Sequence, residues 1–255
     1  MRPVAALIAC VVAVAGSGCL ALASAAPPRS GYDDLSPALR ALQRDDTQNP
    51  AMLWLAEGER LWSAGPSACA SCHGADARQA LRGVVLRYPA WDEATRRPIT
   101  LGQRVEQCRV QRQGRPPQGP EGTERLPLEL LAGHASRGLP LAPPADPRLA
   151  TARQRGEALF RQPLGQLALS CAACHERLAG RRLAGSTIPE GHPNGYPIYR
   201  LEWQAVGSLQ RRLRGCMTGV RAEPFAPDAL EWTELEVFLR HRAAGLPVET
   251  PAVRP

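Results

Sequence analysis

A five-residue motif, Cys-x-x-Cys-His, occurs twice in this chain and constrains its fold more than any other feature. The two copies are residues 69–73 and 171–175. Two thiols spaced in this way on one helical turn reach the two vinyl groups of a haem, and the next residue projects an imidazole at the iron. A lone copy would also suit a redox dithiol or half of a zinc site, but two copies predict a cytochrome with two covalently bound haem c groups. The expected covalent attachments are Cys69, Cys72, Cys171 and Cys174, and the expected iron ligands are His73 and His175.

The motif is part of a longer internal repeat. One cysteine follows each copy, Cys108 in the first half and Cys216 in the second, and each half closes with a similar phrase, residues 128–140 and 235–247. Landmarks that recur in the same order about one hundred residues apart indicate a tandem duplication. The segment 140–147 is half proline and cannot continue a helix, so we expect a linker there.

The fold class follows from the apolar spacing, which is helical wherever it is readable, as in 52–56 and 230–238. No strand alternation competes with it. Each half is expected to have a helix before the haem motif, a long irregular stretch, a short helix carrying the single cysteine, and a closing helix. The prediction is a mainly α protein with two tandem class I cytochrome c-like domains and long irregular loops. The N-terminal haem c domain is expected over 27–147 and the C-terminal one over 148–255.

The first 26 residues have the layout of a secretory signal peptide. Arg2 is followed by an apolar stretch and then by small residues ending in Ala25. Export to the periplasm is expected, with no membrane association after cleavage; a retained anchor at this end and a lipid anchor at Cys19 are the alternatives. Six cysteines remain in the mature chain, in a compartment where stray thiols oxidise.

The formal charge of +7 comes from arginine alone, because the chain has no lysine. Guanidinium groups suit carboxylate and sulfate-like anions and haem propionates. Nucleic acid is not an expected partner, since the arginines are scattered and lack the interleaved aromatic residues of a stacking surface.

The sixth iron ligand decides whether such a haem carries electrons or also meets a substrate. Methionine is a common sixth ligand in electron carriers. However, Met52 precedes its haem motif, and the position of the first half that matches Met217 is occupied by Arg109. Cys108 and Cys216 do correspond, so thiolate ligation of both irons is predicted. A disulfide between these two cysteines is one alternative. The corresponding histidines His134 and His241 are rival distal ligands, whereas His192 has no counterpart and is expected in a loop near the second haem.

The chain resembles the dihaem form of SoxA, the catalytic cytochrome subunit of the bacterial thiosulfate-oxidising Sox system. The resemblance spans almost the whole mature chain. Both haem motifs carry it, together with three longer phrases: GHPNGYPIYRLEWQ at 191–204, LQRRLRGCM at 209–217 leading to VRAEP at 220–224, and GLPVETP at 245–251.

The resemblance implies an L-cysteine S-thiosulfotransferase that works with the monohaem cytochrome SoxX. Such an enzyme couples thiosulfate oxidatively to a cysteine of the carrier protein SoxYZ and releases two electrons. By the same resemblance Cys216 is the catalytic cysteine, able to carry an extra sulfur, Arg212 contacts the substrate, and Cys108 ligates the first haem.

The residues themselves agree in part with that reading. Thiosulfate is a dianion, and arginines crowd around Cys216. However, Arg104 precedes Cys108 by four residues as Arg212 precedes Cys216, so an arginine here can equally serve a haem propionate. Arg242 is a weaker candidate. A dihaem thiosulfate dehydrogenase that forms tetrathionate and a plain dihaem electron carrier are the other functions considered.

Overall fold

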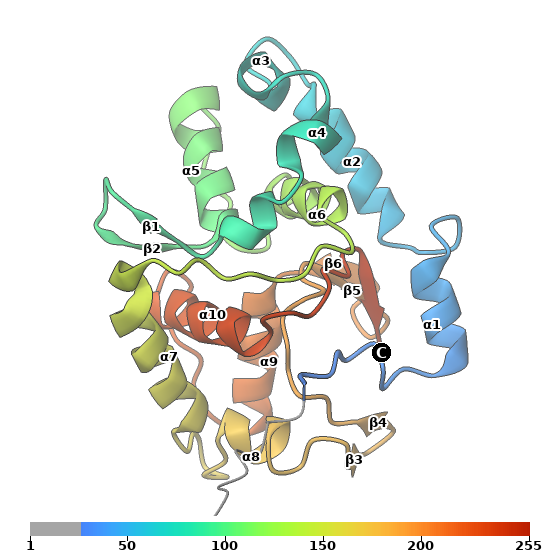
Figure 1. Cartoon of the computed structure of the whole chain (residues 1–255), viewed down its shortest axis with the longest axis vertical. Helices are drawn as coiled ribbons and strands as arrows, with labels where there is room; N and C mark the ends of the chain where they lie inside the picture. Colours follow the sequence, from blue (N-terminus) through green and yellow to red (C-terminus); the bar gives the residue numbers. More distant parts are fainter. Residues whose placement is uncertain (1–26) are drawn as a thin grey trace, which may run out of the picture.

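The computed structural model describes residues 27–255 and shows a mainly helical protein (Figure 1). The predicted signal peptide, with Cys10 and Cys19, lies outside the described residues. The N-terminal half contains α1 (Pro37–Arg44), α2 (Met52–Trp62), α3 (Cys69–His73), α4 (Ala77–Leu81), the 3-10 helix η1 (Val84–Arg87), β1 (Ala90–Asp92), β2 (Arg97–Ile99), α5 (Leu101–Gln113) and α6 (Arg125–Ala135). The C-terminal half contains η2 (Pro147–Leu149), α7 (Ala150–Arg161), α8 (Cys171–His175), β3 (Arg182–Leu183), β4 (Ser186–Thr187), β5 (Ile198–Arg200), β6 (Ala205–Gly207), α9 (Leu209–Gly219), α10 (Leu230–Arg242) and β7 (Ala252–Arg254). Within residues 27–255 no helix is both long and apolar enough to cross a bilayer.

The helices repeat in the order that the sequence predicts, and the two halves pack their helices alike. Helix α2 packs against α6, and α7 packs against α10. Both contacts depend on a glycine: a Cβ at Gly58 would collide with the backbone of Pro127, and one at Gly156 would collide with the backbone of Glu234. Glycine at these positions therefore lets the backbones of the paired helices approach closely. The helices that carry the single cysteines are longer than expected, at 13 residues for α5 and 11 for α9.

The repeated closing phrases pair with each other. Residues 138–141 and 245–248 run antiparallel, with Pro140 opposite Pro247, and four backbone hydrogen bonds of 2.8 to 2.9 Å join them. The four bonds form two pairs that interchange when the two halves are exchanged, so a local two-fold axis passes between the two segments. One apolar cluster continues across this junction: Val84, Val85, Leu101, Ala132, Leu141, Ala243, Leu246 and Val248. The two halves therefore share a core.

Short strands complete the structure, although the sequence gives no strand signal. Strand β5 lies between antiparallel β6 and parallel β7, and each of the three has only three residues. Segments this short cannot show an alternating pattern. The last strand is held by the beginning of the described chain, because buried Asn49 donates to the Pro251 carbonyl at 2.9 Å and Gln43 accepts from the Val253 N–H at 3.0 Å.

Candidate functional site

The two haem motifs lie at opposite ends of the long axis of the molecule, in α3 and α8 (Figure 1). At the first motif, burial raises the pKa of the Cys69 thiol, and the Cys108 sulfur of α5 raises it further. The side chain of Gln113 donates to the Cys69 sulfur at 3.7 Å. The indole of Trp62 bonds to the carbonyl of Gly74 at 3.0 Å, which packs this side chain beside the motif.

The second motif has the same arrangement, but its residues are more buried than those of the first. Ser170 caps α8 by accepting from the Ala173 N–H at 3.1 Å. Burial raises the pKa of Cys171 to about 11, and the adjacent Cys216 sulfur of α9 contributes to that rise. Each single cysteine therefore lies near the first cysteine of its own motif.

All six cysteines of the described residues are free, so the disulfide between Cys108 and Cys216 is not formed. In residues 27–255 no three His, Cys, Asp or Glu side chains are placed to hold a bare metal ion.

The histidine of the second motif is fixed by its own loop. His175 Nδ1 lies 2.8 Å from the Pro189 carbonyl, and burial lowers the pKa of this imidazole. A neutral imidazole that donates from Nδ1 presents its other nitrogen, Nε2, as a metal ligand. Gly191, at φ +75°, packs against the ring, and any Cβ there would lie 2.9 Å from it. The glycine therefore allows the loop to cover the imidazole.

Helix α9 carries both Cys216 and Arg212. Residues four apart share one face of a helix, and Ser208 caps this helix by accepting from the Arg211 N–H at 3.0 Å. Within the described part of the chain Arg212 forms no ion pair and no side-chain hydrogen bond. Its equivalent, Arg104, binds buried Asp92 at 2.7 Å. The two arginines thus match in sequence but differ in whether a carboxylate neutralises them.

Other arginines near the motifs have partners. Arg109 is buried and pairs with Glu106 and Glu124, while Met217 at the matching position packs in an apolar cluster. Arg242 stacks on Phe160 at 4.6 Å to the ring centroid, donates to the Glu190 carbonyl at 3.0 Å and lies 3.7 Å from Glu176. Arg242 therefore ties three segments of the C-terminal half together.

The three remaining histidines lie in different settings. His241 Nδ1 lies 2.8 Å from the Val237 carbonyl of its own helix. His134 is half-buried, and burial together with Arg137 and Arg78 lowers its pKa to about 4. His192 lies in the loop that covers His175, as expected; its Nε2 lies 2.9 Å from Glu190, and its Nδ1 is buried with no hydrogen-bond partner among residues 27–255.

Two residues of this site escaped the sequence analysis. Tyr196 and Arg200 both lie close enough to Arg212 and Cys216 to interact with them electrostatically: burial raises the pKa of Tyr196 to about 12, and burial and then Arg212 lower the pKa of Arg200. Both belong to the phrase 191–204, whose length marked it as distinctive. The phrase contains no haem-ligand motif, so nothing in it indicated a role for these side chains.

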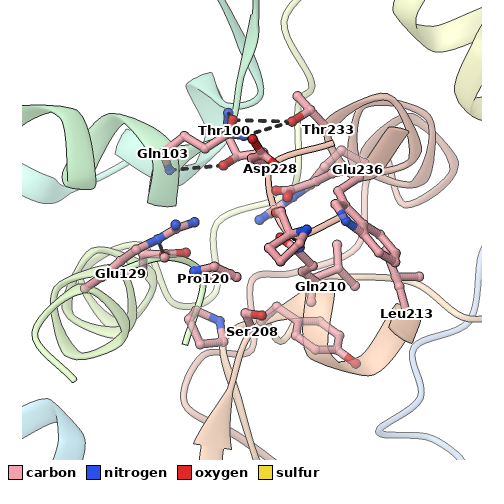
Figure 2. A pocket seen from close by; sticks show the side chains of 18 residues that line it. Thr100, Gln103, Pro120, Glu129, Ser208, Gln210, Leu213, Asp228, Thr233 and Glu236 are labelled. Carbon is pink, nitrogen blue, oxygen red and sulfur yellow. Dashed lines mark hydrogen bonds and ion pairs between the residues drawn. The ribbon is translucent and has the colours of Figure 1, made fainter. Parts of the chain in front are cut away.

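A separate cavity of ≈ 230 Å³ lies between the two halves. Figure 2 shows Thr100 and Gln103 of the N-terminal half facing Thr233 of the C-terminal half, and Gln103 bonds to Thr233 at 3.2 Å. No motif cysteine lines it. The cavity thus belongs to the junction between the halves and is distinct from both haem motifs.

The SoxA/TsdA cytochrome c domain family matches residues 57–141 and 155–248. The chain belongs to this cytochrome c family. Relatives of this SoxA/TsdA chain include three proteins named L-cysteine S-thiosulfotransferase subunit SoxA. That of Pseudaminobacter salicylatoxidans is 36% identical over 84% of the chain and 77% of the relative. That of Rhodovulum sulfidophilum is 33% identical over 89% of the chain and 80% of the relative. That of Paracoccus pantotrophus is 32% identical over 88% of the chain and 78% of the relative.

The crystal structure of SoxXA from P. pantotrophus contains a chain of the same fold as this SoxA/TsdA member. The TM-score is 0.84 at 31% identity, covering 89% of this chain and 87% of that one. The expected resemblance to SoxA and the expected cytochrome c fold are confirmed. A cytochrome c domain binds haem c, and the residues present here suit that group. Each end has two motif thiols with a further thiol near the first of them, and at the second end a hydrogen bond orients the His175 imidazole.

Proposed function

We propose that the chain is the catalytic subunit of an L-cysteine S-thiosulfotransferase that couples thiosulfate to a cysteine of the carrier SoxYZ. The single observation that carries the proposal is the pairing on α9: Cys216 lies beside the second haem motif, and Arg212, four residues away, has no carboxylate partner in the described chain. A positive side chain without a partner next to a sulfur is suited to hold a sulfur-containing dianion.

The proposed reaction starts from the carrier thiolate and the thiosulfate dianion, so it releases electrons but no proton. The outer sulfur of thiosulfate bonds to the carrier thiolate, giving a carrier-bound S-thiosulfonate with one negative charge, and two electrons leave. A haem bound at the second motif supplies a one-electron acceptor beside the sulfurs, and the c-type cytochrome SoxX is the proposed next acceptor. Arg212 holds the sulfonate oxygens and reduces the repulsion between the two anionic sulfurs as they approach. Cys216 is the proposed catalytic cysteine.

Two haems are proposed for the chain. One would be attached through Cys69 and Cys72, and His73 and Cys108 would bind its iron. The other would be attached through Cys171 and Cys174, and His175 and Cys216 would bind its iron. The protein would be periplasmic after removal of residues 1–26 and would form a heterodimer with SoxX, as the relative of known structure is a SoxXA complex. The mass of the mature chain and its ultraviolet-visible spectrum would count the haems and report thiolate ligation.

The experiment that tests the function measures thiosulfate consumption by the haem-loaded chain with SoxX, in the presence and absence of SoxYZ. Consumption that requires SoxYZ and adds thiosulfate to the carrier supports the proposal. Tetrathionate formed without the carrier would instead identify a thiosulfate dehydrogenase. No consumption under either condition would leave an electron carrier.

A further inference from the structure

The first residues that the structure describes lie against the loop that covers His175. This covering loop comprises residues 189–195. The backbone N–H of Arg29 donates to the Glu190 carboxylate at 2.9 Å, across 161 positions of the sequence. Gly31 lies beside Pro189, because a Cβ built on this glycine would be 3.6 Å from the proline Cβ. The segment 29–31 is therefore in contact with the covering loop.

Ser30 joins the same segment to the C-terminal end of the fold. It is buried, and its hydroxyl donates to Glu249 and accepts from the Asn194 side chain at 3.3 Å. Asn194 of the covering loop is also buried, and it donates in addition to the Pro247 carbonyl at 3.0 Å. The segment 29–31, the covering loop and residues 247–249 thus form one hydrogen-bonded unit.

The covering loop in turn orients the imidazole of the second motif. Pro189 and Gly191 flank Glu190, and both contact His175: the Pro189 carbonyl lies 2.8 Å from its Nδ1, and the glycine packs on its ring. Arg242 holds the Glu190 backbone by donating to its carbonyl at 3.0 Å. A displacement of Glu190 would therefore move the carbonyl that bonds to Nδ1. A hydrogen bond from the second ring nitrogen makes a metal-bound histidine a stronger donor and so lowers the potential of the metal.

The first motif has no comparable support. His73 is exposed, and no hydrogen bond to its ring forms within residues 27–255. The two motifs also lie at opposite ends of the molecule (Figure 1). A change in the segment 29–31 should therefore act on the second motif alone, which makes the first motif an internal control.

From these contacts we propose that the segment 29–31 and Glu190 position His175, and that they lower the reduction potential of a haem bound at the second motif. Arg29 acts through its backbone N–H and Ser30 through its hydroxyl, and neither contacts the imidazole itself. The proposal requires a haem on Cys171 and Cys174 but no particular substrate, so it goes beyond the function proposed above.

The test measures the reduction potential of each haem in the holoprotein, by redox titration followed by electron paramagnetic resonance. Arg29→Pro removes the N–H that binds Glu190, whereas the matched control Arg29→Ala keeps this N–H and removes only the side chain. Arg29→Pro should shift the reduction equilibrium of the second haem about three- to tenfold toward the reduced form, as expected for a weakened hydrogen bond, and leave the first haem unchanged. Arg29→Ala should match wild type at both haems.

Variants of Glu190 test the same contact from the other side. Glu190→Ala removes the acceptor and should give a shift in the same direction that is at least as large. Glu190→Gln keeps an acceptor oxygen for the Arg29 N–H and should recover most of the wild-type value. The double variant Arg29→Pro/Glu190→Ala should equal Glu190→Ala alone, since both changes act through one hydrogen bond.

Three results would overturn the proposal. One is a wild-type potential of the second haem in both Arg29→Pro and Glu190→Ala. Another is an equal shift of both haems, which would indicate a general loss of stability. The third is a shift in Arg29→Ala as large as that in Arg29→Pro, which would assign the effect to the ion pair of Arg29 with Asp34. The potentials are measured without thiosulfate. A chain that shows the expected shifts yet never consumes thiosulfate would therefore contradict the proposed function and leave the positioning role intact.

Discussion

The haem motif of the N-terminal half is exposed at Cys72 and His73, whereas Cys174 and His175 of the C-terminal half are half-buried under the loop around residue 190. The nearby charges differ in the same direction. Arg104 is neutralised by Asp92, while Arg212 has no carboxylate partner in residues 27–255. Duplicated helices have therefore produced one end whose charges are satisfied internally and one end whose charge remains available. The second end is the one equipped to hold an anionic substrate.

The largest difference between the halves is expected for the single cysteines. Cys216→Ser should lower thiosulfate turnover by about 10³-fold or more, because a hydroxyl replaces the sulfur that lies beside the second motif. Cys108→Ser should change turnover by no more than about threefold, since the first motif lies at the other end of the molecule. Steady-state assays with SoxX and SoxYZ measure both, with haem content checked by spectrum. Comparable losses in the two variants would mean that the halves share the catalytic work.

The equivalent arginines Arg212 and Arg104 should affect different properties, substrate binding for Arg212 and stability for Arg104. Arg212→Gln should lower kcat/KM for thiosulfate by about 10²-fold through loss of a charge-assisted contact, with little change in stability. Arg104→Gln should leave kcat/KM unchanged and reduce the free energy of unfolding by about 1–2 kcal/mol, because buried Asp92 keeps its bonds from Thr95 but loses its only charged partner in residues 27–255. Kinetics and denaturant titration of both variants give the comparison. A stable Arg104→Gln chain with weakened thiosulfate binding would show that the first half also meets the substrate.

The features that the sequence predicts correctly are local ones, whereas contacts between distant segments were not predicted. The repeat, the helix order and the nearness of Cys108 and Cys216 to their motifs follow from spacing and periodicity, which are local properties. The partner of Arg104 does not, because Asp92 belongs to a three-residue strand with no sequence signal. Arg104 and Arg212 are equivalent by position, so spacing alone cannot tell a neutralised guanidinium from a free one.

The pairing of the two halves at their junction was also not predicted from the sequence. Nothing in the repeated Gly-Leu-Pro phrases indicated that they would pair with each other, since each reads simply as the end of its own half. The sequence therefore predicted two domains and missed their common core. Long-range contacts of this kind depend on the whole fold, and a duplication supplies two chemically similar surfaces whose pairing no local pattern records.

The helix contacts that both halves share should be equally sensitive to added volume. Gly156→Ala and Gly58→Ala should each reduce the free energy of unfolding by about 1–3 kcal/mol, since the new methyl group meets a carbonyl of the partner helix. Gly219→Ala is the matched control: it lies in α9 with open space around it and should be neutral or stabilising by up to about 1 kcal/mol. Denaturant titration of the three variants measures this. A neutral Gly156→Ala would contradict the close contact between α7 and α10.

The smallest difference concerns how the two cysteine-bearing helices begin. Helix α5 caps itself, because Thr100 and Gln103 form a reciprocal capping box with bonds of 2.8 and 3.2 Å. Helix α9 has Arg211 in place of that glutamine, and Glu121 of the N-terminal half instead accepts from the Ser208 N–H at 3.3 Å and from its hydroxyl. The helix that carries Arg212 is thus fixed at its first turn by the other half.

Glu121→Ala and Thr100→Ala should each lower the free energy of unfolding by about 1 kcal/mol through loss of a cap. Only Glu121→Ala should also lower thiosulfate turnover, by roughly two- to fivefold, since a small shift of α9 misplaces Arg212 and Cys216. Glu121→Gln keeps an acceptor oxygen for Ser208 and should restore most of the turnover, which a mere loss of stability would not predict. Equal turnover in the Thr100→Ala and Glu121→Ala chains would mean that the N-terminal half stabilises the catalytic helix without positioning it.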